Sequence, residues 1–215
     1  MSRPTDWWWI RHAPVPEGGV RIFGQRDVDC DVTDAGSIRA LARILPADAV
    51  GLVSPLRRTR QTYDAIAAAG AALPTPLVEP DLVEQSFGRW EGMNWSEMEQ
   101  TDPAGYAGFW ENPTRTPPPG GESFAAVMAR VAAVVDILSA RHAGRAIVCV
   151  SHGGTIRAAV AAALALAPET AMAIVIDNLS VTRLSHVSGG ILRARAGAWM
   201  VRGVNIPMRD RAPSP

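Results

Sequence analysis

Short apolar runs alternate with longer amphipathic stretches along most of this chain. Apolar runs closed by polar residues or glycine are typical of buried strands, and we predict such strands at residues 7–10, 49–53, 76–79 and 146–150. Apolar side chains spaced three and four positions apart predict helices at residues 34–45, 57–69, 122–142 and 154–166. Further apolar runs joined by short turns predict strands at residues 172–177, 180–185, 191–195 and 198–202. This alternation predicts the α/β fold class, a sandwich with helices on both faces of one sheet.

Residues 84–121 interrupt the alternation with a stretch rich in tryptophan, glycine and proline. A connection of this length usually has a function of its own, so we expect residues 84–121 to form a cap over a functional site. No internal repeat and no linker divides the chain, and we predict that residues 1–215 form a single domain. The tail at residues 210–215 is expected to be loose.

Composition and charge narrow the function classes. The 215 residues carry 21 basic and 21 acidic side chains, so the formal net charge is zero and no nucleic-acid surface is indicated. No apolar run is long enough for a membrane span, and two cysteines make no disulfide framework. These features favour a cytoplasmic protein. Two-fold symmetric dimers are the commonest assemblies of soluble proteins, and on that general ground alone we expect a homodimer.

Two histidines directly follow predicted strands. His12 comes after Arg11 at the end of strand 7–10, and His152 precedes a pair of glycines after strand 146–150. Ligands of open α/β sheets bind at the carboxyl ends of the strands. Because the glycine pair after His152 lies where the predicted helix at residues 154–166 begins, backbone N–H groups there can also face an anion. The pattern predicts a site that binds an anion and carries out chemistry on it.

Phosphoryl transfer needs positive charge, a nucleophile and a group that protonates the leaving oxygen. Strand 49–53 is followed by Ser54 and a cluster of arginines at positions 57, 58 and 60, whose guanidinium groups can bind two phosphate oxygens at once. The segment that contains Glu84 supplies a carboxylate near aromatic residues, and an apolar setting can raise the pKa of a carboxyl group enough for it to donate a proton near neutral pH. Glu91 lies seven residues further on and is an alternative capping or ion-pairing carboxylate.

Other conspicuous residues have structural interpretations. Arg57 and Arg60 are expected to be solvated or ion-paired, and Glu122 or Ser123 can cap the helix at residues 122–142. The tryptophans of the middle segment are expected to pack in the core or the cap, at positions 90, 95 and 110.

Five motifs in order resemble those of the histidine phosphatase superfamily, the phosphoglycerate-mutase-like group. They are Arg11-His12, the segment SPLRRTRQT with Arg58, the segment LVEQSFGRWEG with Glu84, the segment from Pro119 to Ser123, and VSHGG with His152. The resemblance extends from Trp7 to Asn205, nearly the whole chain. It implies a three-layer α/β/α sandwich with a mostly parallel central sheet.

The resemblance also implies a mechanism. His12 attacks the phosphorus of a small phosphorylated metabolite while Glu84 protonates the departing oxygen, and water then hydrolyses the phosphohistidine. Arg11, Arg58 and His152 hold the phosphoryl oxygens, so neither a metal nor another cofactor is expected. We also expect the neighbouring arginines to keep His12 neutral, because they disfavour a third positive charge.

The chain departs from the family pattern at two places. Ala13 stands where the family usually has glycine, which is acceptable where the backbone does not need a positive φ. The loop at residues 23–33 differs from the family's loop at the substrate entrance, and within it Gln25 and Arg26 are candidate substrate contacts, together with Gly153.

The short, proline-rich connection at residues 92–121 favours a phosphatase, because mutases of the family carry a longer insertion there. The segments RHAPV and FGQRD also resemble α-ribazole phosphatases, which makes that substrate one candidate. The alternatives are phosphoglycerate mutase-type transfer and a non-catalytic protein that binds a phosphorylated ligand.

Overall fold

A computed structural model describes residues 3–16, 21–191 and 198–209 of the chain. Within these residues one sheet has the strand order β3-β2-β4-β1-β5-β6. The strands are β1 (Thr5–Arg11), β2 (Val50–Val53), β3 (Leu77–Val78), β4 (Ala146–Ser151), β5 (Val181–His186) and β6 (Trp199–Ile206). Strands β1 to β4 run parallel, whereas β5 is antiparallel to both of its neighbours. The expected α/β fold with a mostly parallel sheet is confirmed.

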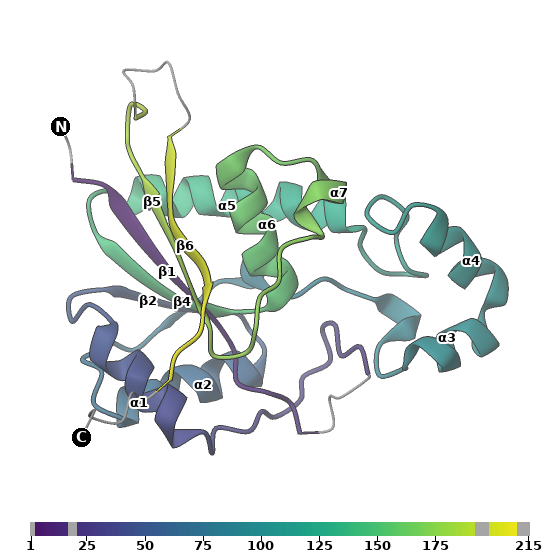
Figure 1. Ribbon diagram of the computed structural model, residues 1–215, viewed down its shortest axis with the longest axis horizontal. Coiled ribbons are helices and arrows are strands. Elements are labelled where there is room, and N and C mark those ends of the chain that lie inside the picture. Colours follow the sequence, from purple (N-terminus) through teal and green to yellow (C-terminus); the bar gives the residue numbers. More distant parts are fainter. Residues whose placement is uncertain (1–2, 17–20, 192–197, 210–215) are drawn as a thin grey trace.

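Helices cover both faces of this sheet (Figure 1). One face carries α1 (Ala35–Ile44) and α2 (Arg57–Ala68). The other face carries α5 (Phe124–Arg141), α6 (Gly153–Leu164) and the short α7 (Pro168–Ala171). The apolar faces of these helices bury the two sides of the sheet, which accounts for the three layers.

The tryptophan run in β1 shows how the sequence builds these layers. Alternate side chains of a strand point to opposite faces, and Trp7 and Trp9 accordingly pack on the side of α5 and α6 while Ile10 packs on the side of α1 and α2. The rings of Trp7 and Trp9 stack with centroids 4.7 Å apart, and Trp7 Nε1 donates a 2.9 Å hydrogen bond to Ser139 Oγ. The central strand is therefore anchored on both faces.

The helix starts follow the capping residues of the sequence. Asp34 caps α1 by accepting from the Ser37 N–H, and Ser123 caps α5 by accepting from the Ala126 N–H. Glu122 is not the cap, because its carboxylate binds Arg130. At α6 the N-cap residue His152 makes no capping hydrogen bond with its side chain, and the first turn of this helix lies at the carboxyl end of β4.

Residues 172–177, predicted as a strand, form turns and an irregular segment that follows α7. The prediction was wrong because the carbonyl groups of this segment bind arginine side chains instead of a neighbouring strand. Arg11 donates to the Ile176 carbonyl oxygen and Arg157 to that of Ile174. The predicted strand at residues 76–79 shortens to β3, and the one at 191–195 lies outside the described residues apart from Ile191, as does the tail at 210–215.

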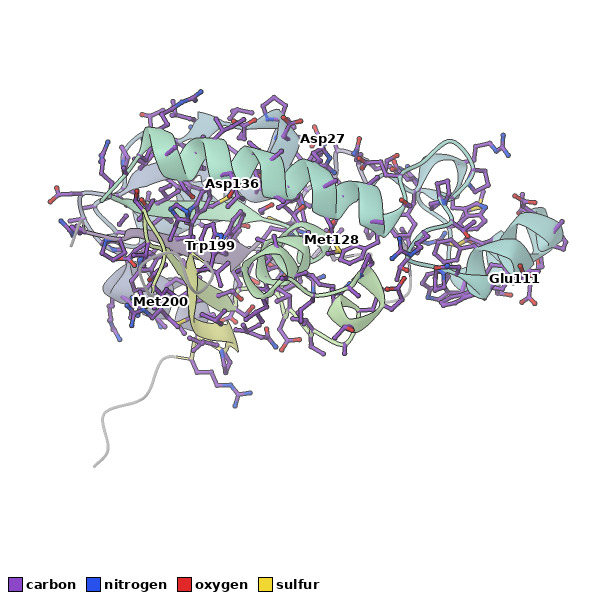
Figure 2. The ribbon with its side chains drawn as sticks, turned by 90° about the horizontal axis from the view of Figure 1, so that it is seen from above. Asp27, Glu111, Met128, Asp136, Trp199 and Met200 are labelled. Atoms are coloured by element: carbon purple, nitrogen blue, oxygen red, sulfur yellow. The ribbon has the colours of Figure 1, made fainter. Side chains whose placement is uncertain are left out.

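Residues between Glu84 and Gly121 form short helices that project beyond one end of the sheet (Figure 1). These are the 3-10 turn η2 (Gly88–Trp90) and the helices α3 (Trp95–Thr101) and α4 (Pro103–Glu111), preceded by the turn η1 (Pro80–Leu82). Figure 2 shows Glu111, the last residue of α4, at the opposite end of the molecule from Trp199 and Met200 of β6. Trp90, Met98 and Phe109 form a separate small core for this segment. No helix in the described ranges is long and apolar enough to cross a membrane.

Candidate active site

The candidate site lies where β1, β2 and β4 end. Arg11 ends β1 and His12 follows it, Arg58 lies in the first turn of α2 after β2, and His152 links β4 to α6. Because the three strands are parallel neighbours, their carboxyl ends meet at one edge of the sheet. Glu84 reaches the same place from the loop after η1, and all of these residues except His152 line a cavity of about 930 Å³.

His12 is buried, and the backbone of the next residue orients its ring. Its Nδ1 lies 2.7 Å from the Ala13 carbonyl oxygen, which can only accept, so Nδ1 carries the proton of the neutral ring and Nε2 has a free lone pair. The pKa of His12 is lowered to about 3, first by burial and next by the charge of Arg58. We expected the arginines to keep His12 neutral; they contribute, but burial is the larger cause. Ala13 is not among the described residues with positive φ, which explains why a methyl group is accepted there.

Two guanidinium groups stand beside His12. Arg58 is almost completely buried and donates from Nη1 to the Arg26 carbonyl oxygen and from Nη2 to the Gly24 carbonyl oxygen, both at 2.7 Å. Arg11 donates from Nη1 to the Ile176 carbonyl oxygen, while its buried Nε has no partner among the described residues. Burial lowers the pKa of both arginines, and the charge of Glu84 partly offsets that effect.

His152 is fully buried with its ring 5.2 Å, centroid to centroid, from that of His12. Its Nε2 lies 2.7 Å from Ser54 Oγ, and its Nδ1 has no partner in the part of the chain that the structure describes. The pKa of His152 is lowered well below its ordinary value, first by burial and then by electrostatic interactions with neighbouring groups, among them His12 and the Arg58 guanidinium. A neutral ring bonded at Nε2 therefore has Nδ1 available for a ligand.

Glu84 is held against the start of α6. One carboxylate oxygen accepts from the Gln85 N–H at 2.9 Å and the other from the Gly154 N–H at 3.2 Å. A Cβ at position 154 would overlap Glu84 Oε1, so the second glycine after His152 is what permits this approach. Gly153, the first glycine, lines the cavity beside Arg11.

Gln25 and Arg26 lie beside the site but do not line the cavity. Gln25 Nε2 donates to the Glu84 carbonyl oxygen at 2.9 Å, and its backbone N–H binds the Glu91 carboxylate. The side chain of Arg26 lies against Gly92, while its carbonyl oxygen receives Arg58. In this structure the divergent loop positions Glu84 and Arg58; direct substrate contact by Gln25 or Arg26 stays a prediction.

The other arginines of the cluster are ion-paired, as expected. Arg57 binds Asp27 and Asp29, and Arg60 binds Asp64. The described residues contain no group of three or more His, Cys, Asp or Glu side chains that could hold a metal ion. Arg11, Arg58 and Arg157 are among the residues that line the cavity.

Sequence reasoning missed several residues that line the cavity. Arg157 lies on α6, four positions after Gly153, and this helical spacing could have indicated the same face. Asn178 lines the cavity too, and its Nδ2 donates to the His12 carbonyl oxygen at 2.7 Å. Trp95 and Trp110 pack against each other in the cap, as expected, and both are also partly exposed within the cavity.

Buried histidines and guanidinium groups meet at the ends of parallel strands, an arrangement suited to binding an anion. The sequence profile of the histidine phosphatase superfamily (branch 1) matches residues 7–196. The chain belongs to this superfamily.

Similar proteins agree with this assignment. Phosphoserine phosphatase 1 of Hydrogenobacter thermophilus is 31% identical over 159 residues, which cover 72% of this chain and 74% of that protein. A bifunctional protein of Mycobacterium tuberculosis is 39% identical over 99 residues, and the match spans 46% of this chain but only 26% of that protein. The α-ribazole phosphatase of Shigella flexneri has the same fold, with a TM-score of 0.79 at 21% identity over 94% of this chain and 96% of that chain.

Proposed function

We propose that this protein hydrolyses a small phosphorylated metabolite through a phosphohistidine on His12, without a metal ion. The observation that supports this most strongly is the state of His12, which is buried and neutral with a free Nε2 beside the Arg58 guanidinium. Neutral imidazole is the nucleophilic form of histidine, and the nearby positive charge stabilises the phosphoryl group under attack.

In the first step the Nε2 lone pair of His12 forms a bond to phosphorus while the bond from phosphorus to the ester oxygen breaks. The carboxylic proton of Glu84 moves to the departing oxygen, which leaves as an alcohol. Arg11, Arg58 and the Nδ1 side of His152 bind the phosphoryl oxygens as charge shifts onto them.

In the second step water attacks the phosphorus of the phosphohistidine. Glu84, now a carboxylate, accepts a proton from the water, the bond from phosphorus to nitrogen breaks, and inorganic phosphate leaves. We propose that residues 84–121 act as a cap within a single domain, since they contribute Glu84, Trp95 and Trp110 to the wall of the cavity. A cytoplasmic location and a homodimer stay predictions.

Phosphoserine and α-ribazole 5′-phosphate are candidate substrates because the similar proteins are phosphatases of these names. The match to phosphatases favours hydrolysis over phosphoglycerate mutase-type transfer and over a non-catalytic role. A mutase would interconvert phosphoglycerates faster than it releases phosphate, so measuring both rates separates the two activities.

The test of the proposal is phosphate release from 4-nitrophenyl phosphate in the presence of a chelator. We expect turnover by the wild type and none by His12→Ala, while the matched control His186→Ala on β5 retains the wild-type rate. Metal-independent turnover that survives His12→Ala would contradict the proposal.

A further inference from the structure

The cavity at the candidate site is much larger than a phosphoryl group requires. Its volume of about 930 Å³ is continuous from His12 and Arg58 to Trp95 and Trp110 on the projecting helices. Cavities of this size bind whole small molecules with most of their surface buried. The end that lies away from His12 therefore has room for a substantial leaving group.

Aromatic side chains line this far end. The far end carries the tryptophan pair Trp95 and Trp110, and the aromatic lining of the whole cavity comes from five separate segments and consists of Phe23, Phe87, Trp95, Phe109, Trp110 and Phe124. The rings of Trp95 and Trp110 lie 5.3 Å apart, centroid to centroid, and their side chains keep 37% and 48% of their surface exposed. Edge contacts with Tyr106 and Phe109 fix the Trp110 ring. A fixed, uncovered aromatic pair is a suitable surface for a flat apolar group.

Charged groups at the far end already have hydrogen-bond partners within the protein. Arg21 forms two hydrogen bonds with the Glu97 carboxylate and a third with the Gly92 carbonyl oxygen. Glu84 is the one carboxylate among the described residues that line the cavity, and it binds backbone N–H groups beside His12. The far end thus offers no carboxylate for an ammonium group such as that of phosphoserine.

We propose that the preferred substrate is a phosphate monoester whose alcohol carries an apolar ring that lies against Trp95 and Trp110. This inference rests on the proposed phosphatase function and specifies its substrate class. The phosphoryl group occupies the cationic end, and the ring occupies the aromatic end of the same cavity.

A series of alkyl esters tests the proposal on the unmodified protein. Ethyl phosphate, 2-phenylethyl phosphate and 2-(1-naphthyl)ethyl phosphate all release a primary alcohol, so their leaving groups are of similar basicity and differences report binding of the ring. We expect kcat/KM for 2-phenylethyl phosphate to exceed that for ethyl phosphate by at least about tenfold, because the cavity buries a phenyl ring. Phosphoserine should resemble ethyl phosphate.

Variants then locate the contact. Trp95→Ala and Trp110→Ala should each lower the ratio of kcat/KM between 2-phenylethyl and ethyl phosphate. Ile137→Ala removes an exposed apolar side chain from α5, outside the cavity, and should leave the ratio unchanged.

Two failures are distinguishable. Equal kcat/KM for the ring-bearing and ethyl esters, or a preference for phosphoserine, overturns the substrate assignment while leaving the phosphatase function intact. No phosphate release from any ester, including 4-nitrophenyl phosphate, overturns the phosphatase function and the substrate assignment with it.

Discussion

The imidazole rings of His12 and His152 lie edge to face, with centroids 5.2 Å apart and planes inclined by 63°. Both rings are buried, and both have pKa values below the ordinary value of histidine because burial disfavours the charged form. Their partners differ, however. His12 donates to a carbonyl oxygen, whereas His152 contacts a hydroxyl group that can donate to it. Two neutral histidines can thus serve as nucleophile and as hydrogen-bond donor.

Ser54 decides which nitrogen of His152 carries the proton. When its hydroxyl donates to Nε2, the proton of the neutral ring is on Nδ1, which then donates to a phosphoryl oxygen. We predict that Ser54→Ala lowers kcat by about tenfold with little change in KM. A tenfold loss corresponds to losing about one hydrogen bond to a charged group in the transition state. The nitrogen-15 spectrum of the His152 ring should shift toward the other tautomer. An unchanged tautomer in Ser54→Ala, or no recovery in Ser54→Thr, contradicts this role.

Burial of neutral His12 makes stability depend on pH. The pKa is about 3 in the folded protein and about 6.5 in the unfolded chain. Between these values the unfolded chain binds more protons, so the free energy of unfolding falls as pH falls, by about 1.4 kcal/mol per pH unit from this residue. The stabilisation from a neutral His12 is complete above pH 6.5 and is lost progressively below it.

His12→Gln removes this titration. Urea unfolding at several pH values between 7 and 5 should give a shallower decline of stability for His12→Gln than for the wild type. Parallel declines would show that His12 is already charged in the folded protein.

Glu84 as proton donor has a kinetic signature in the leaving group. Glu84→Gln should lower kcat/KM for ethyl phosphate by about 100-fold or more, because the ethoxide oxygen needs a proton as it departs. The loss should be much smaller for 4-nitrophenyl phosphate, whose phenolate leaves unaided. Glu111→Gln at the exposed end of α4 is the matched control (Figure 2) and should change neither rate. Equal losses on both esters would assign Glu84 a role other than protonating the leaving group.

The sequence was sufficient for features that depend on local pattern. Buried strands followed by Arg11-His12 and by His152 could be predicted because apolar runs and their ends are properties of neighbouring residues. Residues 172–177 were misread because their apolar pattern is that of a strand, while their carbonyl groups bind Arg11 and Arg157 from distant segments. The pattern placed Trp95 and Trp110 in the cap but could not show that they also line the cavity, since exposure inside a cavity depends on how α3 and α4 are placed. The local pattern of apolar and polar residues does not determine long-range packing.

A substitution at Gly88 tests the backbone geometry of the segment that carries Glu84. It lies four residues after Glu84 with φ at +53°, and a Cβ there would overlap the Pro119 carbonyl oxygen and the backbone of Gly120. We predict that Gly88→Ala lowers the free energy of unfolding by about 1–3 kcal/mol, the cost of a strained backbone, and lowers kcat by displacing Glu84.

Gly108→Ala is the matched control for this prediction. Gly108 lies in α4 without a positive φ, and a Cβ there would meet nothing within 4 Å. Because alanine favours the helix, this substitution should raise the free energy of unfolding by about 0.5–1 kcal/mol and leave kcat unchanged. Chemical denaturation and phosphate release measured on both variants decide the matter. If Gly88→Ala were as stable and active as Gly108→Ala, the loop that carries Glu84 would have to adopt a backbone different from the one described.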